Sequence, residues 1–295
     1  MKPNFLCVGA QKAGTTTLHD ILKQHPDIYL PKIKESHFFD RSDHYGNGIQ
    51  WWLQEFFGDY AGEKIMGEIT PEYLYYEEVP EKIYKDLGPD TKIIIILRNP
   101  MDRAYSHYLM SKRRNYEKMT FEEAILAERE RIEMGAFERN HFSYIDRGLY
   151  AEQLKRYYSL FGKERIMLLI FEEDIKKDIK RTIQKIEVFL GVEQIPLNTN
   201  LESNVAREPI NKEFNKFLRD KSLVKYVLGK LIFSKKVKYK IAKLLEELNM
   251  REIDVDKSTL SEVIKKELLI NYFLDDINEI EKNIGIDLSM WKENL

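Results

Sequence analysis

The sequence predicts an α/β fold with three layers, in which helices cover both faces of a central, mostly parallel sheet, plus a helical C-terminal extension. Short apolar runs alternate with amphipathic helical stretches along most of the chain. The run Lys92–Leu97 contains four consecutive isoleucines, which is typical of a central parallel strand covered on both faces. The strand 5–8 passes through a glycine-containing turn directly into a helix. These features together favour a parallel sheet over an antiparallel one.

The individual elements follow from local patterns. We expect strands at 5–8, 28–30, 65–69, 92–97 and 165–171, and helices from Thr15 to before Pro26, from 100 to 108, over 117–135 and over 176–190. Gly191 is a C-cap signal for the last of these helices. From about residue 209 the pattern becomes helical. We therefore expect one domain over residues 1–295, with a core of about 1–205 and a helical part of about 209–295.

Composition excludes several classes of protein. The 47 basic residues against 49 acidic residues give a net charge of −2, so the whole chain offers no electrostatic case for nucleic acid. The single cysteine, Cys7, cannot form an internal disulfide and suits a reducing compartment. No apolar run reaches the ~18–20 residues of a transmembrane segment, so we expect a cytoplasmic location.

A lysine-rich stretch at 221–243 contains eight lysines and no acidic residue. We interpret it as a helix with a basic, solvated face. Peripheral contact with an anionic membrane and a lid over a substrate-binding site are the alternatives.

The turn from Gly9 to Gly14 has the G-x-x-x-x-G spacing of a P-loop, which indicates a P-loop-like fold. A nucleotide kinase would have lysine directly after the second glycine, whereas here Thr15 follows and the lysine, Lys12, lies inside the turn. The isoleucine-rich strand ends in Arg98 and not in an aspartate that could hold Mg²⁺. The pattern favours a phosphate-like ligand bound without a metal, and a purely structural turn is the alternative.

Arg98 is a second candidate anion ligand. An arginine at the carboxyl end of a central parallel strand lies where open α/β sheets bind ligands, and its planar group can bind a phosphate through two hydrogen bonds. Ser106, eight residues later, supplies a hydroxyl for the same anion. Two anion sites at two strand ends imply a nucleotide with phosphates at both its 5′ and 3′ positions. A surface ion pair of Arg98 is the alternative.

Several segments resemble the sulfotransferases that use 3′-phosphoadenosine 5′-phosphosulfate (PAPS). Residues 8–18 are similar to the family's 5′-phosphosulfate loop, and residues 96–108 to its 3′-phosphate motif. Residues 34–40 and 67–74 resemble the heparan-sulfate and related carbohydrate branch. Weaker similarities lie at 148–154, 171–174 and 286–291.

The resemblance implies a role for each matching residue. PAPS would be the donor and 3′-phosphoadenosine 5′-phosphate (PAP) the product, with no metal required. The residues implied for the phosphosulfate are Lys12, Ala13, Gly14, Thr15 and Thr16, and those for the 3′ side are Arg98, Ser106 and Arg207. Lys12 would also stabilise the charge that develops on the leaving phosphate, which makes it catalytic.

The resemblance also implies an acceptor site. Glu35 is the candidate general base, with His37 and Asp40 as residues that position the acceptor. Glu68 is either a second acidic contact or a satisfied group at the end of a strand. Glu35 can also be read as a solvated loop carboxylate beside Lys34, and His37 as a packed core histidine. Which of Glu35 and His37 is the base stays open.

The acceptor itself is the least determined part. Gln11 and Ile69 stand where the heparan branch tends to carry basic residues, which argues against a heparin-like acceptor. We expect a small-molecule or glycan acceptor with a hydroxyl or amine, and make no prediction of the oligomeric state. The competing functions are a P-loop nucleotide kinase that requires Mg²⁺ and a nucleotide-binding module without catalytic activity.

Overall fold

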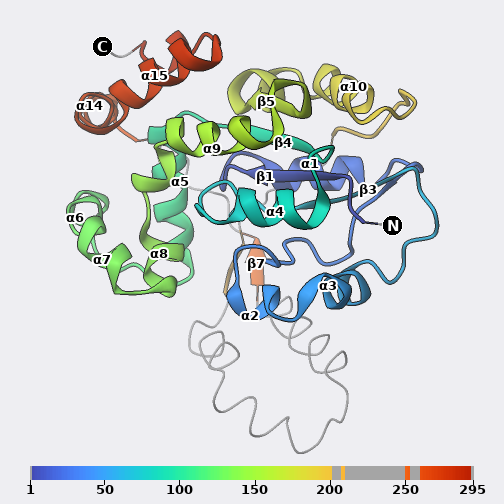
Figure 1. Cartoon of the computed structure of the whole chain (residues 1–295). Coiled ribbons are helices and arrows are strands. Elements are labelled where there is room, and N and C mark those ends of the chain that lie inside the picture. The colour runs from blue at the N-terminus through green and yellow to red at the C-terminus, as the bar shows by residue number, and fades with distance from the viewer. Residues whose placement is uncertain (1, 201–206, 210–249, 253–259, 294–295) are drawn as a thin grey trace, which may run out of the picture. The chain divides into compact units, whose positions relative to one another are not determined.

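The computed structural model describes residues 2–200, 207–209, 250–252 and 260–293 (Figure 1). The chain divides into two compact units. The first comprises Met1–Leu109, Met119–Ser203 and Leu260–Leu295, and the second comprises Met110–Lys118 and Asn204–Thr259. The lysine-rich stretch 221–243 lies outside the described residues, so its predicted roles stay predictions.

The first unit is built on a five-stranded sheet in which every paired strand is parallel, as the sequence predicts. The strand order is β2-β3-β1-β4-β5. The strands are β1 Phe5–Gly9, β2 Ile28–Tyr29, β3 Ile65–Ile69, β4 Lys92–Leu97 and β5 Ile166–Ile170. Their carboxyl ends therefore meet at one edge of the sheet, where the candidate loops begin.

The core follows from the apolar runs noted in the sequence. All five residues of β1 are buried, and so are the four isoleucines of β4. Close packing between β1 and β3 requires glycine at position 67, because a Cβ there would lie 1.9 Å from a ring carbon of Phe5. Helices therefore cover both faces of the sheet around β1 and β4.

The helices of the first unit connect and cover the strands (Figure 1). They are α1 Thr15–Leu22, α2 Ser42–Tyr45, α3 Gly48–Phe56, α4 Val79–Leu87, α5 Pro100–Arg113 (which continues into the second unit), α6 Phe121–Leu126, α7 Glu128–Met134, α8 Ala136–Phe142, α9 Ala151–Phe161, α10 Ile179–Leu190, α14 Glu262–Leu268 and α15 Leu274–Ile284. Short 3₁₀ turns span Asp146–Gly148, Lys163–Arg165 and Ser289–Trp291, and π-helical turns span Phe171–Lys177 and Leu269–Phe273.

The direction of the crossovers explains the layers. In the strand order, the connection from β1 to β2 runs toward one edge of the sheet. The connections from β3 to β4 and from β4 to β5 run toward the opposite edge. Since such crossovers are right-handed, α1 lies on one face, and α4 and α9 lie on the opposite face, where they contact each other.

Several boundaries differ from the prediction. The helix predicted over 117–135 is two helices, α6 and α7, and the former begins with a capping box at Thr120 and Glu123. The strand predicted over 165–171 ends at Ile170, where a π-helical turn begins. Gly191 is confirmed as a left-handed C-cap, with φ of 81°.

The expectation that residues from about 209 onward are entirely helical is wrong. In the second unit, β6 Arg207–Pro209 pairs antiparallel with β7 Met250–Glu252. A three-residue strand carries almost no periodic signal, because its existence depends on the partner strand. Residues Leu260–Leu295 belong to the first unit, and the predicted division into a core and a C-terminal part stays a prediction.

The C-terminal helices are tied to the core by side-chain hydrogen bonds. Asp276 of α15 accepts from the backbone N–H groups of Tyr150 (2.8 Å) and Ala151 (3.0 Å) at the start of α9. Trp291 is buried and donates from Nε1 to Glu172 over 3.2 Å. In the described part of the chain, no helix combines the length and the apolar character that a membrane crossing needs.

Candidate active site

The phosphosulfate loop, residues 9–14, runs from the carboxyl end of β1 to the start of α1. Gly14 caps α1 with φ of 84°, and a Cβ at this position would lie 3.0 Å from side-chain atoms of Phe171 and Ile175. Glycine therefore satisfies both the left-handed backbone and the close packing. No side chain caps α1 and its first turn has no acidic residue, so its N-terminus suits an anionic group.

The residues predicted to hold the phosphosulfate lie together on this loop. Lys12 is half-buried, Ala13 is buried, Thr15 is 4% exposed, and Thr16 is exposed at the first turn of α1. Lys12 has φ of 74°, a left-handed conformation that is costly for a residue with a side chain. Such strain is concentrated at functional sites.

Arg98 lies at the carboxyl end of β4, beside this loop. Its Nη1 donates to the carbonyl oxygen of Lys12 over 2.9 Å, and its guanidinium lies 4.9 Å from the centre of the Phe171 ring. Its Nε is buried without a hydrogen-bond partner among the described residues. Ser106 lies on α5, which begins two residues after Arg98, and is partly exposed. The structure thus brings Arg98 to the Lys12 loop, as the sequence predicts.

The segment after β4 is held by residues from distant parts of the chain. Glu172 accepts from the backbone N–H of Asn99 (3.0 Å) and from Trp291, while the Tyr150 hydroxyl donates to the carbonyl of Arg98 over 3.0 Å. In the sequence, Tyr150, Glu172 and Trp291 lie in segments that have only weak similarity to the family. Their hydrogen bonds hold the backbone of the segment that carries Arg98.

The acceptor loop, residues 34–40, follows β2. Glu35 has φ of 66° and His37 has φ of 52°. With Lys12, they make three of the four described non-glycine residues that have positive φ, and Asn115 is the fourth. The strained backbone is therefore concentrated at the predicted site, which indicates that the surrounding structure holds these conformations.

The fixed part of the acceptor loop is Ser36. Its N–H donates to Oε1 of Glu68 over 2.8 Å, and its hydroxyl accepts from Nε1 of Trp52 over 2.8 Å. Glu68 is 1% exposed and also accepts from the hydroxyls of Thr70 (2.8 Å) and Tyr73 (3.2 Å). Burial raises the pKa of Glu68, and these hydrogen bonds offset part of that increase. The structure thus shows Glu68 as a hydrogen-bonded group beneath the loop, and its contact with an acceptor stays a prediction.

The two phenylalanines that follow His37 anchor the other side of the loop. Phe38 and Phe39 are fully buried, and Phe38 stacks on Trp52 at 4.8 Å between ring centres. His37 itself is not in the core, because 30% of its side chain is exposed. The reading of His37 as a packed core histidine is therefore wrong.

His37 forms a pair with Asp40, with 2.9 Å between Nδ1 and Oδ2. Burial by itself lowers the pKa of His37. The hydrogen bond to Asp40 and the charges of Glu72, Asp40 and Glu35 act in the opposite direction and raise the pKa from 6.5 to about 9. At neutral pH the ring is an imidazolium, which can donate a proton or stabilise an anion but cannot accept a proton.

Glu35 is the half-buried carboxylate of the loop, with 34% of its side chain exposed. Lys34, whose side chain is 16% exposed, forms an ion pair with it. A freely solvated loop carboxylate would be more exposed than this, and its lysine partner would be too.

Sequence reasoning missed Glu72 as a member of this site. Glu72 is 8% exposed and accepts from Nε2 of Gln11 over 2.9 Å. Potential ligand atoms of Glu35, His37 and Glu72 lie within 4.8 Å of one another, the only such group among the described residues. The expectation of a metal-free site stays a prediction.

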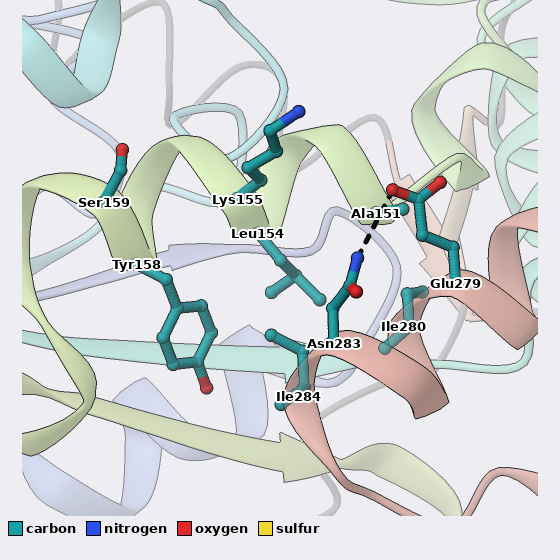
Figure 2. Close-up of a pocket in the computed structure, with 9 residues that line it drawn as sticks. All are labelled: Ala151, Leu154, Lys155, Tyr158, Ser159, Glu279, Ile280, Asn283 and Ile284. Atoms are coloured by element: carbon teal, nitrogen blue, oxygen red, sulfur yellow. Dashed lines mark hydrogen bonds between the residues drawn. The ribbon is translucent and has the colours of Figure 1, made fainter.

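Two further features lie outside these loops. Arg207 opens β6 in the second unit, so its predicted contact with the nucleotide stays a prediction. A groove of about 440 Å³ lies between α9 and α15, with Leu154, Tyr158, Ile280 and Ile284 among its lining residues (Figure 2). No residue predicted for the site lines it.

Comparison with known proteins agrees with this geometry. A family profile described as "Sulfotransferase domain" matches residues 2–238. The human heparan sulfate glucosamine 3-O-sulfotransferase 5 is 30% identical over 210 residues, which is 70% of this chain and 58% of the relative. The human 3-O-sulfotransferase 3B1 is 31% identical over 193 residues, 65% of this chain and 47% of the relative. The chain thus spans about half the length of these relatives.

A solved structure covers almost the whole chain. The crystal structure of a sulfotransferase from Alicyclobacillus acidocaldarius has a TM-score of 0.70 and 30% sequence identity, and the match covers 99% of this chain and 100% of that one.

Proposed function

The chain belongs to the sulfotransferase family, and on that premise we propose that it transfers a sulfuryl group from PAPS to a hydroxyl or amine of a carbohydrate-like acceptor. The observation that carries the proposal is the meeting of two anion-binding elements at one sheet edge. Arg98 and the Lys12 loop are joined by a hydrogen bond of 2.9 Å. A nucleotide with phosphates at both its 5′ and 3′ positions matches such a pair of sites.

The donor would bind with its phosphosulfate over the N-terminus of α1. Backbone N–H groups and the hydroxyls of Thr15 and Thr16 are donors for the 5′-phosphate. Arg98 and Ser106 are donors for the 3′-phosphate. Lys12 is the residue for the bridging oxygen, where negative charge increases as the sulfur–oxygen bond breaks.

Glu35 is the base in this proposal. The acceptor oxygen forms a bond to sulfur while the bond from sulfur to the bridging oxygen breaks, so PAP leaves with the electron pair. The proton of the acceptor hydroxyl passes to the carboxylate of Glu35. His37 is protonated because of Asp40 and the neighbouring carboxylates, and its positive charge can stabilise the sulfuryl oxygens in the transition state.

The comparisons support a carbohydrate-like acceptor, because the human relatives are named for the glucosamine of heparan sulfate. A nucleotide kinase is less well supported. Thr15 follows Gly14 where a kinase has lysine, and Arg98 ends the strand where an acidic metal ligand would be expected. We accordingly propose that the donor needs no metal.

The test is transfer itself. The protein is incubated with PAPS labelled in the sulfuryl group and an extract of host glycans, lipids and small metabolites, and products are detected by label and by mass. The proposal expects a product heavier by one sulfuryl group and an equal amount of PAP. PAP release without any sulfated product, or no consumption of PAPS, would contradict it.

A further inference from the structure

Gln11 and Glu72 form a polar pair between the phosphosulfate loop and the acceptor loop. Oε1 of Glu72 accepts from Gln11 over 2.9 Å, and Oε2 is buried without a hydrogen-bond partner among the described residues. Glu72 also makes no ion pair with a lysine or arginine of the described chain. A carboxylate that is 8% exposed and has only a neutral partner keeps much of its electrostatic effect on its surroundings.

The charges of the acceptor loop itself are paired. Lys34 pairs with Glu35, and His37 pairs with Asp40 at 2.9 Å. Arg147, which also acts on Tyr76 near this site, is 3% exposed, packs against the Tyr75 ring at 4.2 Å and donates to Ser143 and Asn140, so it makes no ion pair with Glu72.

In the proposed function Lys12 contacts the phosphosulfate of the donor, which carries the opposite charge. Glu72 is therefore a buried carboxylate that no lysine or arginine of the described residues neutralises through an ion pair.

This charge lies next to the reacting groups. Potential ligand atoms of Glu72, Glu35 and His37 lie within 4.8 Å of one another, and Glu72 is among the charges that act on His37. An acceptor whose hydroxyl reaches Glu35 must come within a few ångströms of Glu72. Like charges brought together at such a distance in a half-buried site repel each other.

We propose that Glu72, held by Gln11, determines acceptor specificity, and that the acceptor is an uncharged hydroxyl compound, such as a neutral sugar, and not a polyanion. The inference rests on the proposed function, because it assumes that the acceptor enters beside Glu35. It separates this chain from the relatives named for heparan sulfate, which is itself a polyanion.

The test measures how tightly the PAP-loaded protein binds a polyanion. An N-sulfated heparosan hexasaccharide is titrated by calorimetry in EDTA into the parent, Glu72→Gln and Glu77→Gln. Glu77→Gln removes the same charge from a neighbouring carboxylate that is 88% exposed. We expect the hexasaccharide to bind Glu72→Gln about five- to tenfold more tightly than the parent, the size expected for one half-buried like charge. Glu77→Gln should bind within about twofold of the parent, because its charge is screened by water.

A second measurement uses turnover. The parent should sulfate the uncharged N-acetylglucosamine pentamer in preference to the hexasaccharide, and Glu72→Gln should reduce this preference.

Equal binding of the hexasaccharide to the parent and Glu72→Gln, no binding to either, or an equal gain in Glu77→Gln would overturn the inference. PAP affinity that is unchanged in Glu72→Gln shows that the variant is folded. Failure of the parent to bind PAP would contradict the proposed function itself, which keeps the two failures distinct.

Discussion

Nη1 of Arg98 donates a hydrogen bond to the main-chain carbonyl oxygen of Lys12 over 2.9 Å. The bond joins the end of β4 to the loop that follows β1, two strands that are adjacent in the sheet but more than 80 residues apart in the sequence. Arg98 therefore has two tasks in the proposed function. It binds the 3′-phosphate, and it supports the strained backbone of Lys12.

Arg98→Ala should weaken PAP binding by about 10–100-fold, the effect of losing charge-assisted hydrogen bonds worth about 1.5–3 kcal/mol. Arg98→Lys keeps the charge but loses the planar fork, so it should recover only part of the affinity. Calorimetric titration with PAP checks both variants. An Arg98→Ala protein with parental affinity would show that the nucleotide does not use this residue.

Lys12→Ala should reduce kcat more than it reduces PAP affinity, because the charge that Lys12 stabilises develops in the transition state. The loss of one such electrostatic contact is worth about 10²–10³ in kcat. Steady-state kinetics with PAPS, together with PAP calorimetry, separate the two effects. An unchanged kcat with a raised KM for PAPS would contradict the catalytic assignment of Lys12.

Glu35→Gln keeps the size of the side chain but removes its basicity. We expect PAP affinity within about twofold of the parent and sulfuryl transfer lower by about 10²–10⁴, as for a lost general base. His37→Gln should cost less, because a protonated histidine is not the base. The rates are compared on one acceptor. A nearly active Glu35→Gln beside an inactive His37→Gln would reverse the two roles.

The pair of His37 and Asp40 should make stability depend on pH. Since the pKa of His37 is raised from 6.5 to about 9 in the folded state, its stabilising contribution is fully present below about pH 6.5 and is lost as pH rises toward 9. The difference in Tm between the parent and Asp40→Asn should therefore shrink between pH 6.5 and pH 9.5. NMR titration of the His37 ring measures the pKa directly, and a value near 6.5 in the parent would contradict this account.

Much of the fold could be predicted because its signals are local. The isoleucine run of β4 and the glycine spacing of residues 9–14 each describe one segment, and the structure confirms both. The position of Arg98 beside Lys12 followed from one further rule, that parallel strands end at the same edge.

The rest depends on contacts between distant segments, which leave no periodic pattern. Gln11 bonds to Glu72, 61 residues away, and Trp291 bonds to Glu172, 119 residues away. For Glu68 the sequence left two readings open, an acidic acceptor contact and a satisfied strand-end group, because its hydrogen bonds with Ser36, Thr70 and Tyr73 appear only in the structure. The protonation of His37 likewise depends on carboxylates from two separate segments, so sequence reasoning left the identity of the base open.

The central claim is that the two anion sites bind a nucleotide with phosphates at both its 5′ and 3′ positions and without a metal. Calorimetric titration of the parent with PAP in excess EDTA, compared with ATP plus Mg²⁺, tests it most directly. We predict that PAP binds equally well with and without EDTA, and more tightly than ATP with Mg²⁺. Loss of PAP binding on chelation, or tighter binding of ATP with Mg²⁺, would contradict the claim.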